Sequence, residues 1–442
     1  AVEDHYTYAD LHHHVRRMMT LLREQGIQSG RLVAFTSHNH YASVVTLWAL
    51  LRLRAIAFPI SPRMPPLARH SLLESLHVHA VLDDPDAELR SALARSPHED
   101  GIQTLEIDLP ATAMLTSGST LEPRAAIHTL AAHFASARGS ATNIPLHPGH
   151  HWLWSLPLGH MSGLAIVMRT FLAGATLTIV DRGIENGGSP DTNRVTHMSL
   201  VATQLQRYLA DPRWRPRSLE AVLLGGGPYS RRLVESALDR GVPLHTSYGL
   251  TEMASQVTTT RAGSSTDLLM TAGSPLPGRE IAITSAGEIL VRGETLFLGF
   301  RRGDALELPV DPQGWYPTRD LGQFVGGLLT VHGRLDHMFV SGGENIVPEE
   351  IEASLREFPE IVQAVVVPVD DAEFGNVPVA FVDAPAHDPV AWERWLRDRL
   401  PGFKVPKVFH PWPESDRGSI KPARRELRRK ANALQGQRRA PP

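Results

Sequence analysis

The sequence predicts an α/β protein in which parallel sheets are covered by helices. Three observations lead to this class. Short buried-strand runs alternate with amphipathic helical segments from Tyr8 onward, short strands broken by turns follow Gly273, and helices return after Pro348. Such alternation predicts βαβ units. The later changes predict a β-rich subdomain and then a small α+β domain.

The first elements follow from hydrophobic spacing. Apolar residues from Leu11 to Leu22 recur at helical intervals, which predicts a helix over Tyr8 to Gln25, and Gly26 ends it. The next expected elements are strand 32–36, helix 42–53, strand 55–60, helix 66–76 and strand 80–82. Residues 84–112 are weakly patterned, and we expect a loop-rich connection there.

A hydroxyl-rich turn is the most distinctive stretch of the chain. It comprises Thr116, Ser117, Gly118, Ser119 and Thr120. Its backbone N–H groups can surround an anion, and the guanidinium of Arg124 suits phosphate oxygens. We expect a helix from Ala125 through Ala137, so that the turn lies between a strand and a helix. A polar turn without a ligand is the alternative.

The alternation of strands and helices continues beyond this turn. Further strands are expected over 152–156, 175–180, 198–202, 221–224 and 244–247. The loops that end these strands carry the informative polar groups, and open α/β sheets bind ligands at that edge.

A change of pattern near Arg334 marks the expected domain boundary. Short strands are expected over 280–283, 288–292 and 328–332, and after them helices from 348, 389 and 423 with strands over 364–369 and 377–382. We therefore expect a ligand-binding domain of residues 1–335 and a smaller domain of residues 336–442.

Composition excludes several classes of function. The 442 residues carry a net charge of −3, which predicts no general affinity for nucleic acid or anionic membranes. No apolar run approaches the ~18 residues of a membrane span, so no membrane insertion is expected. The absence of cysteine excludes disulfides and thiolate chemistry and is compatible with a cytoplasmic enzyme.

Two glycine-containing motifs suggest a nucleotide site. In Tyr248 to Glu252, the tyrosine ring could stack on adenine, Thr251 could contact phosphate, and Glu252 could hold Mg²⁺. Gly225, Gly226 and Gly227 allow the backbone to approach a flat ring. The alternatives are a strand-to-helix cap at Glu252 and a simple turn at the glycines.

The motifs in their order resemble the acyl-adenylate-forming superfamily. The series is Thr-Ser-Gly-Ser-Thr, Pro-Leu-Gly-His-Met-Ser-Gly, Gly-Gly-Gly-Pro, Tyr-Gly-Leu-Thr-Glu, Trp-Tyr-Pro-Thr-Arg-Asp-Leu-Gly, Gly-Arg-Leu-Asp, Ser-Gly-Gly-Glu-Asn-Ile and Gly-Ser-Ile-Lys-Pro. The resemblance covers nearly the whole chain. It implies ATP, Mg²⁺ and a carboxylic acid as ligands, with coenzyme A as the acyl acceptor.

The resemblance also implies a role for each matching residue. The hydroxyl-rich turn and Arg124 match the ATP-phosphate loop. The adenine, ribose, phosphate and Mg²⁺ contacts fall to Gly225, Gly226, Gly227, Tyr248, Gly249, Thr251, Glu252, Asp320 and Arg334. Lys421 matches the catalytic lysine of adenylation. Asp336 matches a hinge, about which rotation would withdraw Lys421 and present Gly342 and Gly343 to the pantetheine arm of coenzyme A.

Several segments are similar to the o-succinylbenzoate–CoA ligase subfamily. They include Ser155 to Gly163 and Ser247 to Gln256. A ligase of that kind must bind a second carboxylate without activating it. We expect Ser255 to contact that carboxylate, His160 to shape the pocket beside the reacting carbonyl, and Arg169 to contribute charge. The alternative makes Ser255 a helix-side hydroxyl and Arg169 a surface cation.

Two positions depart from the superfamily pattern. Leu121 stands where glycine is usual and Arg124 where lysine is usual, which affects loop geometry more than the reaction. Other readings are another aryl- or acyl-CoA ligase, an adenylation enzyme that loads a separate carrier, and a non-catalytic adenylate-binding protein. Small-molecule substrates are expected as partners, and a homo-oligomer is compatible with the sequence.

Overall fold

Two seven-stranded sheets form the larger part of the molecule. The computed structural model describes residues 5–96, 104–116, 124–179, 194–371, 373–413 and 424–439. The strand orders are β16-β15-β5-β4-β2-β1-β3 and β12-β11-β10-β9-β8-β6-β7. The expected α/β class with helix-covered parallel strands is confirmed, although both sheets also have an antiparallel edge.

The first sheet is formed by N-terminal strands and two later ones. Its strands are β1 (Leu32–Thr36), β2 (Ile56–Ile60), β3 (Ala80–Leu82), β4 (Pro110–Leu115), β5 (Ala125–Thr129), β15 (Gly299–Arg302) and β16 (Ala305–Glu307). The N-terminal helices are α1 (Tyr8–Glu24), α2 (Tyr41–Arg52), α3 (Pro66–Ser75) and α4 (Pro85–Leu93). The strand predictions for 32–36 and 80–82 are confirmed at both ends.

Helix α4 corrects the expectation of a loop-rich connection over 84–112. Asp84 accepts a hydrogen bond from the backbone N–H of Ala87 at 3.0 Å, and Pro85 occupies the first turn. These are helix-starting signals that act locally. The helix therefore forms although its hydrophobic spacing is weak.

The second sheet carries most of the glycine-containing loops. Its strands are β6 (His151–Leu153), β7 (Thr176–Thr178), β8 (His197–Leu200), β9 (Ala221–Leu224), β10 (Leu244–Leu250), β11 (Ser255–Thr259) and β12 (Ser274–Pro275). Its region also contains α5 (Leu130–Ala141), α6 (Met161–Ala173), α7 (Ala202–Ala210), α8 (Arg231–Asp239), α9 (Thr266–Leu269) and the 3₁₀ turn η1 (Thr251–Met253).

One continuous apolar core joins the two sheets. Val33 and Met114 of the first sheet and Trp152 and Leu223 of the second belong to the same buried cluster. Side chains of α6, including Leu164, fill the space between them. Because this core is shared, the loops at the ends of both sets of strands have fixed relative positions.

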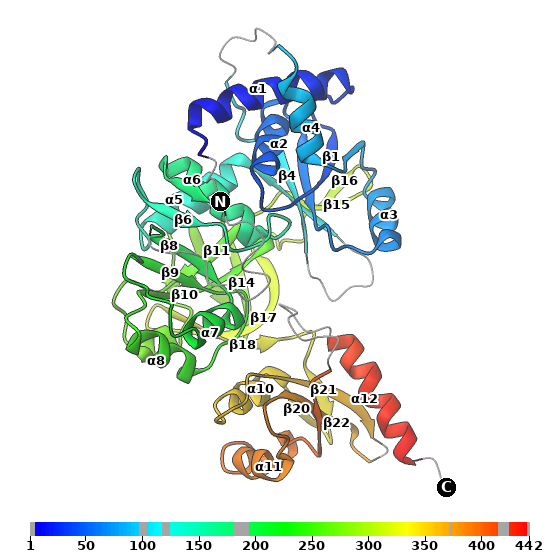
Figure 1. Cartoon of the computed structure of the whole chain (residues 1–442). Helices are drawn as coiled ribbons and strands as arrows, with labels where there is room; N and C mark the ends of the chain where they lie inside the picture. The colour runs from blue at the N-terminus through cyan, green and yellow to red at the C-terminus, as the bar shows by residue number, and fades with distance from the viewer. Residues whose placement is uncertain are drawn as a thin grey trace.

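The remaining strands form a third sheet and a C-terminal unit. The third sheet contains β13 (Arg279–Ile283), β14 (Glu288–Gly293), β17 (Tyr316–Val325) and β18 (Leu328–Arg334). The C-terminal unit contains β19 (Phe339–Ser341), β20 (Glu344–Ile346), α10 (Pro348–Arg356), β21 (Gln363–Asp371), β22 (Gly375–Asp383), α11 (Pro389–Arg397), the 3₁₀ turn η2 (Gly402–Lys404), β23 (Val408–Pro411) and α12 (Arg424–Arg439). Figure 1 shows this unit set apart from the two large sheets and reached through β18.

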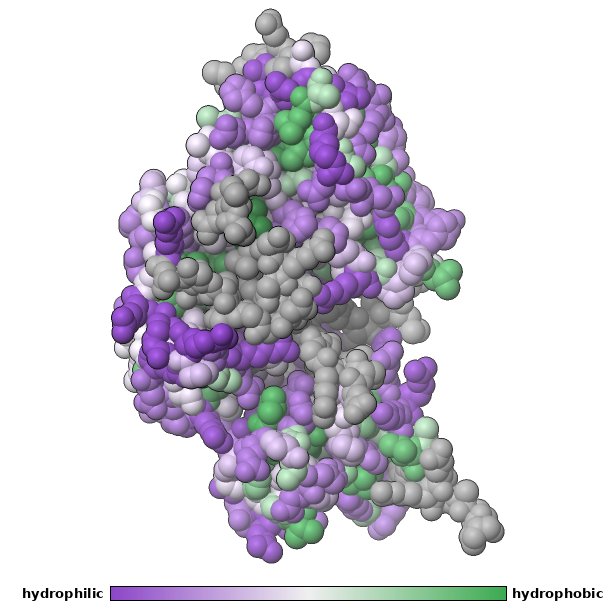
Figure 2. All heavy atoms as spheres, viewed as in Figure 1, coloured by the Kyte–Doolittle hydropathy of each residue, from purple (hydrophilic) through white to green (hydrophobic). Residues whose placement is uncertain are grey.

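The C-terminal unit has apolar clusters of its own. Ile351 and Leu355 of α10 pack with Trp392 of α11, and Val367 of β21 packs with Leu427 of α12. The face in Figure 2 is mostly hydrophilic, with apolar residues in small scattered groups. Within the described ranges, no helix is both long and apolar enough to cross a membrane.

Candidate active site

The strands on either side of the hydroxyl-rich stretch form a β-hairpin. Strands β4 and β5 pair antiparallel, and the backbone N–H of Thr116 donates to the carbonyl of Arg124 at 3.1 Å. The expectation of a helix from Ala125 is therefore wrong. Ala125, Ala126 and Ile127 are fully buried strand residues, and sheet pairing overrides the helical propensity of alanine. Helix α5 begins only at Leu130, after Thr129 caps it.

Several predicted site residues lie outside the described residues. They are Ser117, Gly118, Ser119 and Thr120 of the turn, and Lys421 near the C-terminus. Leu121 lies there too.

Arg124 occupies the base of the hairpin. Its guanidinium lies 5.6 Å from the ring of Phe300, which belongs to the neighbouring strand β15. Its Nε is buried, and among the described residues it has no hydrogen-bond partner. A cation packed on an aromatic face can still interact with an anion. Arg124 is thus held directly before the first residue of β5.

A buried histidine joins the hairpin to the Tyr248–Glu252 motif. His128 Nε2 lies 2.7 Å from the carbonyl oxygen of Thr251, to which it donates. Burial lowers the pKa of His128 to about 4, so the imidazole is neutral at pH 7. The backbone N–H of Phe297 also donates to the carbonyl of Glu252 at 2.8 Å. These bonds fix strand β5 against the turn that carries the predicted Mg²⁺ ligand.

Glu252 itself lies in the 3₁₀ turn η1, which leads into strand β11. The motif therefore passes from strand β10 into a 3₁₀ turn, and Leu250, the cap residue, makes no side-chain capping hydrogen bond. Burial raises the pKa of the Glu252 carboxyl, and Tyr316 donates its hydroxyl hydrogen to Oε1 at 3.3 Å. One carboxylate beside the Thr251 hydroxyl fits Mg²⁺ bound chiefly by nucleotide phosphates and water, because Mg²⁺ usually takes only one or two protein carboxylates.

Tyr248, Asp320, Arg334 and Asp336 form one connected chain. The hydroxyl of Tyr248 donates to Oδ2 of Asp320 at 2.6 Å, and Arg334 Nη1 donates to Oδ1 at 2.9 Å. The same guanidinium binds both carboxylate oxygens of Asp336, at 2.9 and 3.2 Å. The predicted ribose ligand and the predicted hinge residue thus share one cation.

Glycines allow the backbones of neighbouring strands to approach closely at this edge of the second sheet. A Cβ on Gly249 would lie 2.2 Å from the carbonyl oxygen of Ser255, so any other residue would separate β10 from β11. Gly226 has φ of +80°, which favours glycine. Gly225, Gly226 and Gly227 directly follow β9, beside Tyr248 on the adjacent strand β10.

Arg169 of α6 and Ser255 of β11 are in direct contact. Arg169 Nη2 donates to the hydroxyl of Ser255 at 3.3 Å. The alternative of a surface cation is wrong, because Arg169 is only 4% exposed. Within the described part of the chain no carboxylate forms an ion pair with it, and it lies 5.5 Å from the ring of Trp152. Burial, and to a smaller extent Arg279, lowers the pKa of its guanidinium to about 9.

Arg279 is a residue of the site that the sequence alone did not single out. It is buried and donates to the carbonyls of Gln256 at 3.0 Å and Ser136 at 3.2 Å. The hydroxyl of Ser136 in turn donates to the carbonyl of Ala254 at 2.6 Å. Helix α5 is thereby fixed against the segment that carries Ser255. A lone arginine after a Pro-Gly turn gives no sequence signal for such a role.

His160 stands at the start of helix α6. It is the exposed residue before Met161, and Gly163 packs against the preceding turn so closely that a Cβ would lie 2.0 Å from the carbonyl oxygen of Pro157. The sequence Pro-Leu-Gly-His-Met-Ser-Gly therefore forms a tight turn that presents the imidazole at the helix start.

Gly342 and Gly343 form the turn between β19 and β20, with φ of +57° and +89°. The backbone N–H of Gly342 donates to the carbonyl of Phe374 at 3.0 Å. Lys407 Nζ lies 4.5 Å from the centroid of the Phe374 ring. Phe374 and Lys407 were not among the residues predicted from the sequence, although lysines gather near the C-terminus.

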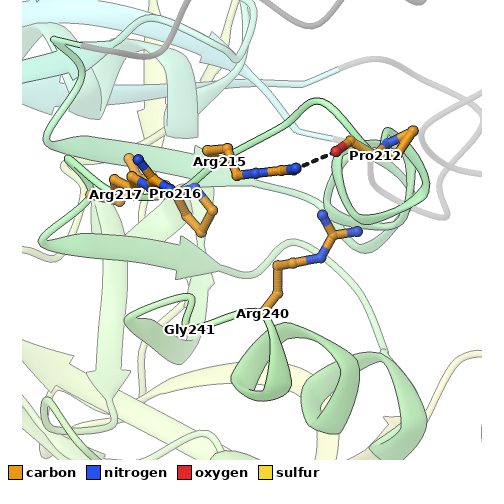
Figure 3. Close-up of a pocket in the computed structure, with 7 residues that line it drawn as sticks. Pro212, Arg215, Pro216, Arg217, Arg240 and Gly241 are labelled. Carbon is orange, nitrogen blue, oxygen red and sulfur yellow. Dashed lines mark hydrogen bonds between the residues drawn. The ribbon is translucent and has the colours of Figure 1, made fainter.

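A cavity of ≈ 660 Å³ is lined by a separate set of residues, which Figure 3 shows in close-up. Its lining includes Arg215, Arg217 and Arg240, and both Arg215 and Arg240 donate to the carbonyl of Trp214, at 3.1 and 3.4 Å. These residues precede β9 and β10, whereas the glycine loop and Tyr248 lie at the other ends of those strands. The cavity is therefore separate from the candidate site.

Comparison with known proteins agrees with this arrangement. The family of AMP-binding enzymes matches residues 1–301, and the C-terminal domain of AMP-binding enzymes matches residues 350–417. The chain belongs to the AMP-binding enzyme family.

Within that family, the chain is similar to 2-succinylbenzoate–CoA ligases. It is 38% identical to the enzyme of Escherichia coli (strain K12) over 91% of this chain and 88% of that one. The o-succinylbenzoate CoA synthetase of Bacillus subtilis in complex with the acyl-adenylate intermediate OSB-AMP has a TM-score of 0.87 and 29% identity, covering 96% of this chain and 94% of that one. The complex of that synthetase with ATP and magnesium has a TM-score of 0.83 and 28% identity, covering 92% and 91%.

Proposed function

We propose that this chain activates 2-succinylbenzoate with ATP and transfers the acyl group to coenzyme A. The aliphatic carboxylate attacks the α-phosphorus of ATP, and the bond to pyrophosphate breaks. The thiolate of coenzyme A then attacks the acyl carbon, and AMP leaves. The similarity to 2-succinylbenzoate–CoA ligases over most of the chain supports this reaction, and so does the family resemblance of the motifs.

The observation that carries the choice of acid is the buried pair of Arg169 and Ser255. A buried guanidinium without a carboxylate partner in the described part of the chain costs solvation energy unless an anion joins it. The ring carboxylate of 2-succinylbenzoate is such an anion. The hydroxyl of Ser255, already in contact with Nη2 at 3.3 Å, would bind the same group.

The remaining residues act on the nucleotide and on the developing charge. The carboxylate of the acid and the α-phosphate of ATP are both anions, and their repulsion is the main barrier to adenylation. Arg124 and Lys421 lower this barrier by placing positive charge beside both anions. Asp320 holds the ribose hydroxyls, Tyr248 and the Gly225–Gly227 backbone face the adenine, and Thr251 and the hydroxyl-rich turn contact phosphate. Glu252 would hold Mg²⁺, which would supply electrostatic stabilisation of the phosphate oxygens. His160 lies beside the reacting carbonyl.

The second half-reaction needs a different lining of the same site. We propose a boundary between domains at residues 335 and 336, with Asp336 as the hinge. Rotation there withdraws Lys421 and brings Gly342 and Gly343 to the adenylate, where their lack of side chains admits the pantetheine arm. Since ATP and coenzyme A are cytoplasmic metabolites, we place the enzyme in the cytoplasm.

The mass of the protein in solution will show whether it forms a homo-oligomer.

The test is turnover with 2-succinylbenzoate, ATP and coenzyme A, compared between the wild type and Lys421→Ala. We expect thioester formation by the wild type and a loss of pyrophosphate release in the variant. A panel of other aryl and acyl acids is measured beside it. Faster turnover of a panel acid than of 2-succinylbenzoate would reject the proposed substrate.

A further inference from the structure

A carboxylate of the C-terminal unit caps a helix of the larger part of the molecule. The backbone N–H of Arg231 donates to Oε1 of Glu357 at 2.8 Å. Arg231 is the first residue of α8, and Glu357 directly follows the last residue of α10. The two helices lie on either side of the boundary proposed at residues 335 and 336 (Figure 1). This hydrogen bond therefore joins the two parts.

The N-terminal end of α8 carries charges that oppose its own dipole. A helix N-terminus has a partial positive charge and is stabilised by carboxylates. The first turn of α8 begins with two arginines and contains no acidic residue. Ser230 accepts a hydrogen bond from the N–H of Leu233 at 3.2 Å. The N–H groups of a first turn have no partner within their helix, and Glu357 satisfies that of Arg231.

The C-terminal end of α10 shows the converse mismatch. A helix C-terminus has a partial negative charge and is stabilised by cations, yet its cap residue is Glu357. Burial lowers the pKa of the neighbouring Arg356, and of the three carboxylates that oppose this change Glu357 has the smallest effect. Glu357 thus gains little within its own unit. The unfavourable charges at the two helix ends compensate each other only where the helices meet.

The contact depends on the relative position of the two units, which we call the pose. Val234 of α8 packs in a core cluster with strands of the second sheet, whereas Leu355 of α10 packs in a cluster of the C-terminal unit. Each partner of the bond therefore moves with a different unit. A hydrogen bond is already lost at about 3.6 Å. Rotation about residue 336 would separate Glu357 from the N–H of Arg231.

We propose that Glu357 is an interdomain latch, which caps α8 in the pose of this structure and releases it when the C-terminal unit rotates. The inference rests on the proposed rotation about Asp336, and it names a contact that stabilises one of the two poses. Helix α8 follows the loop that begins with Gly225, Gly226 and Gly227. The latch thereby connects the position of the C-terminal unit to the helix behind the proposed adenine contacts.

The experiment measures the distance between the two units by double electron–electron resonance. The chain contains no cysteine, so spin labels attach only where cysteine is introduced. Gln206→Cys on α7 and Arg394→Cys on α11 use exposed positions on the two sides of the boundary. The doubly labelled parent is compared with its Glu357→Ala variant, each without ligand and with ATP and Mg²⁺.

We expect Glu357→Ala to reduce the population of the pose in this structure, relative to other poses, by about 2- to 30-fold. This is the range that one helix-capping bond provides. Glu357→Gln keeps an acceptor oxygen but loses the charge, so its distance distribution should lie between those of the parent and Glu357→Ala. Glu360→Gln is the matched control, because Glu360 is an exposed carboxylate three positions further along. Its distribution should equal that of the parent.

Arg231→Pro removes the donor instead of the acceptor. Proline suits the first position of a helix, and Ser230 before it already has the extended conformation that proline requires, with ψ of 155°. The variant also loses the ion pair between the Arg231 guanidinium and the exposed Asp267, which contributes little. Arg231→Pro should therefore shift the distance distribution in the same direction as Glu357→Ala, without loss of α8.

An unchanged distance distribution in Glu357→Ala would overturn the proposal, even if thermal unfolding showed a loss of stability, because a purely structural cap changes only the latter. If Glu357→Ala does not fold, Arg231→Pro provides the same comparison. Two populations in the parent that the variants leave unchanged would reject the latch and retain the rotation. A single distance in the parent and in every variant would reject both. The measurement needs no turnover, so the identity of the acid does not affect it.

Discussion

Tyr248 donates its hydroxyl hydrogen to Oδ2 of Asp320 at 2.6 Å, while Arg334 Nη1 donates to Oδ1 of the same carboxylate. The carboxylate is therefore oriented from both sides before any ligand arrives. A carboxylate oxygen can accept more than one hydrogen bond, so a carboxylate held in this way can also accept one from a ribose hydroxyl, as proposed.

The first prediction concerns this carboxylate. Asp320→Asn keeps the shape of the side chain but loses the charge that strengthens its hydrogen bonds. Hydrogen bonds to charged groups contribute about 1.5–3 kcal/mol, so the KM for ATP should rise by roughly 10- to 100-fold. Steady-state kinetics at saturating acid and coenzyme A measure it. Tyr248→Phe keeps the carboxylate and should have a smaller effect; an unchanged KM in Asp320→Asn would remove the residue from the nucleotide site.

The second prediction separates the two carboxylates of the acid. Arg169→Met should raise the KM for 2-succinylbenzoate by about 100-fold, because a buried charge pair is lost. The analogue 3-benzoylpropionate lacks the ring carboxylate, and its KM should change by less than about 3-fold. Arg138→Met, an exposed arginine on α5, is the control. Equal effects on both acids would mean that Arg169 does not bind the ring carboxylate.

Ser255→Ala supplies a related prediction for the same pocket. Removal of one hydroxyl that bonds a charged group should raise the KM for 2-succinylbenzoate by about 10- to 100-fold. The KM for 3-benzoylpropionate should not rise. An unchanged KM for 2-succinylbenzoate would remove Ser255 from the site.

The next prediction follows from the neutral, buried His128. Its folded-state pKa of about 4 lies below the unfolded value near 6.5. As pH falls, His128 therefore binds a proton at a higher pH in the unfolded chain than in the folded one. Its contribution to the free energy of unfolding is complete above pH 6.5 and is lost between about pH 6.5 and 4. The contribution of this group is about 3 kcal/mol. Urea unfolding at pH 7 and pH 5 should show a smaller pH dependence in His128→Gln, whose amide can still donate to Thr251; an unchanged dependence would assign the effect to other groups.

The last prediction concerns the turn proposed to admit pantetheine. Gly342→Ala places a Cβ 2.9 Å from the ring of Phe374 at a φ of +57°. A left-handed conformation alone costs about 1–2 kcal/mol for a residue with a Cβ. We expect thioester formation to slow by at least about 10-fold while adenylation is preserved. Gly327→Ala is the control, since its φ is +80° but a Cβ there meets nothing within 4 Å.

Most of the fold could be predicted from hydrophobic spacing. Strands β1, β3 and β9 begin and end at the predicted residues. The exceptions have local causes. Helix α4 depends on the cap at Asp84, and β5 is a strand because it pairs with β4 and β15 in a buried sheet. Pairing with distant segments is not visible in a local pattern.

The candidate site could be predicted only where side chains belong to motifs. Tyr248, Glu252 and Asp320 are in such motifs, and the fold brings them to one edge. His128 and Arg279 act through contacts with distant backbone carbonyls, at Thr251 and at Ser136 and Gln256. Their roles depend on tertiary packing, which no spacing along the chain reveals.

The burial of Arg169 near Arg279 has a consequence for the resting protein. Two guanidinium groups in a desolvated interior oppose folding, and in the proposed function the second carboxylate of the acid offsets that cost. Thermal stability and catalytic activity thus make opposite demands on residue 169. An apolar residue in place of Arg169 would raise the free energy of unfolding and lower the catalytic activity.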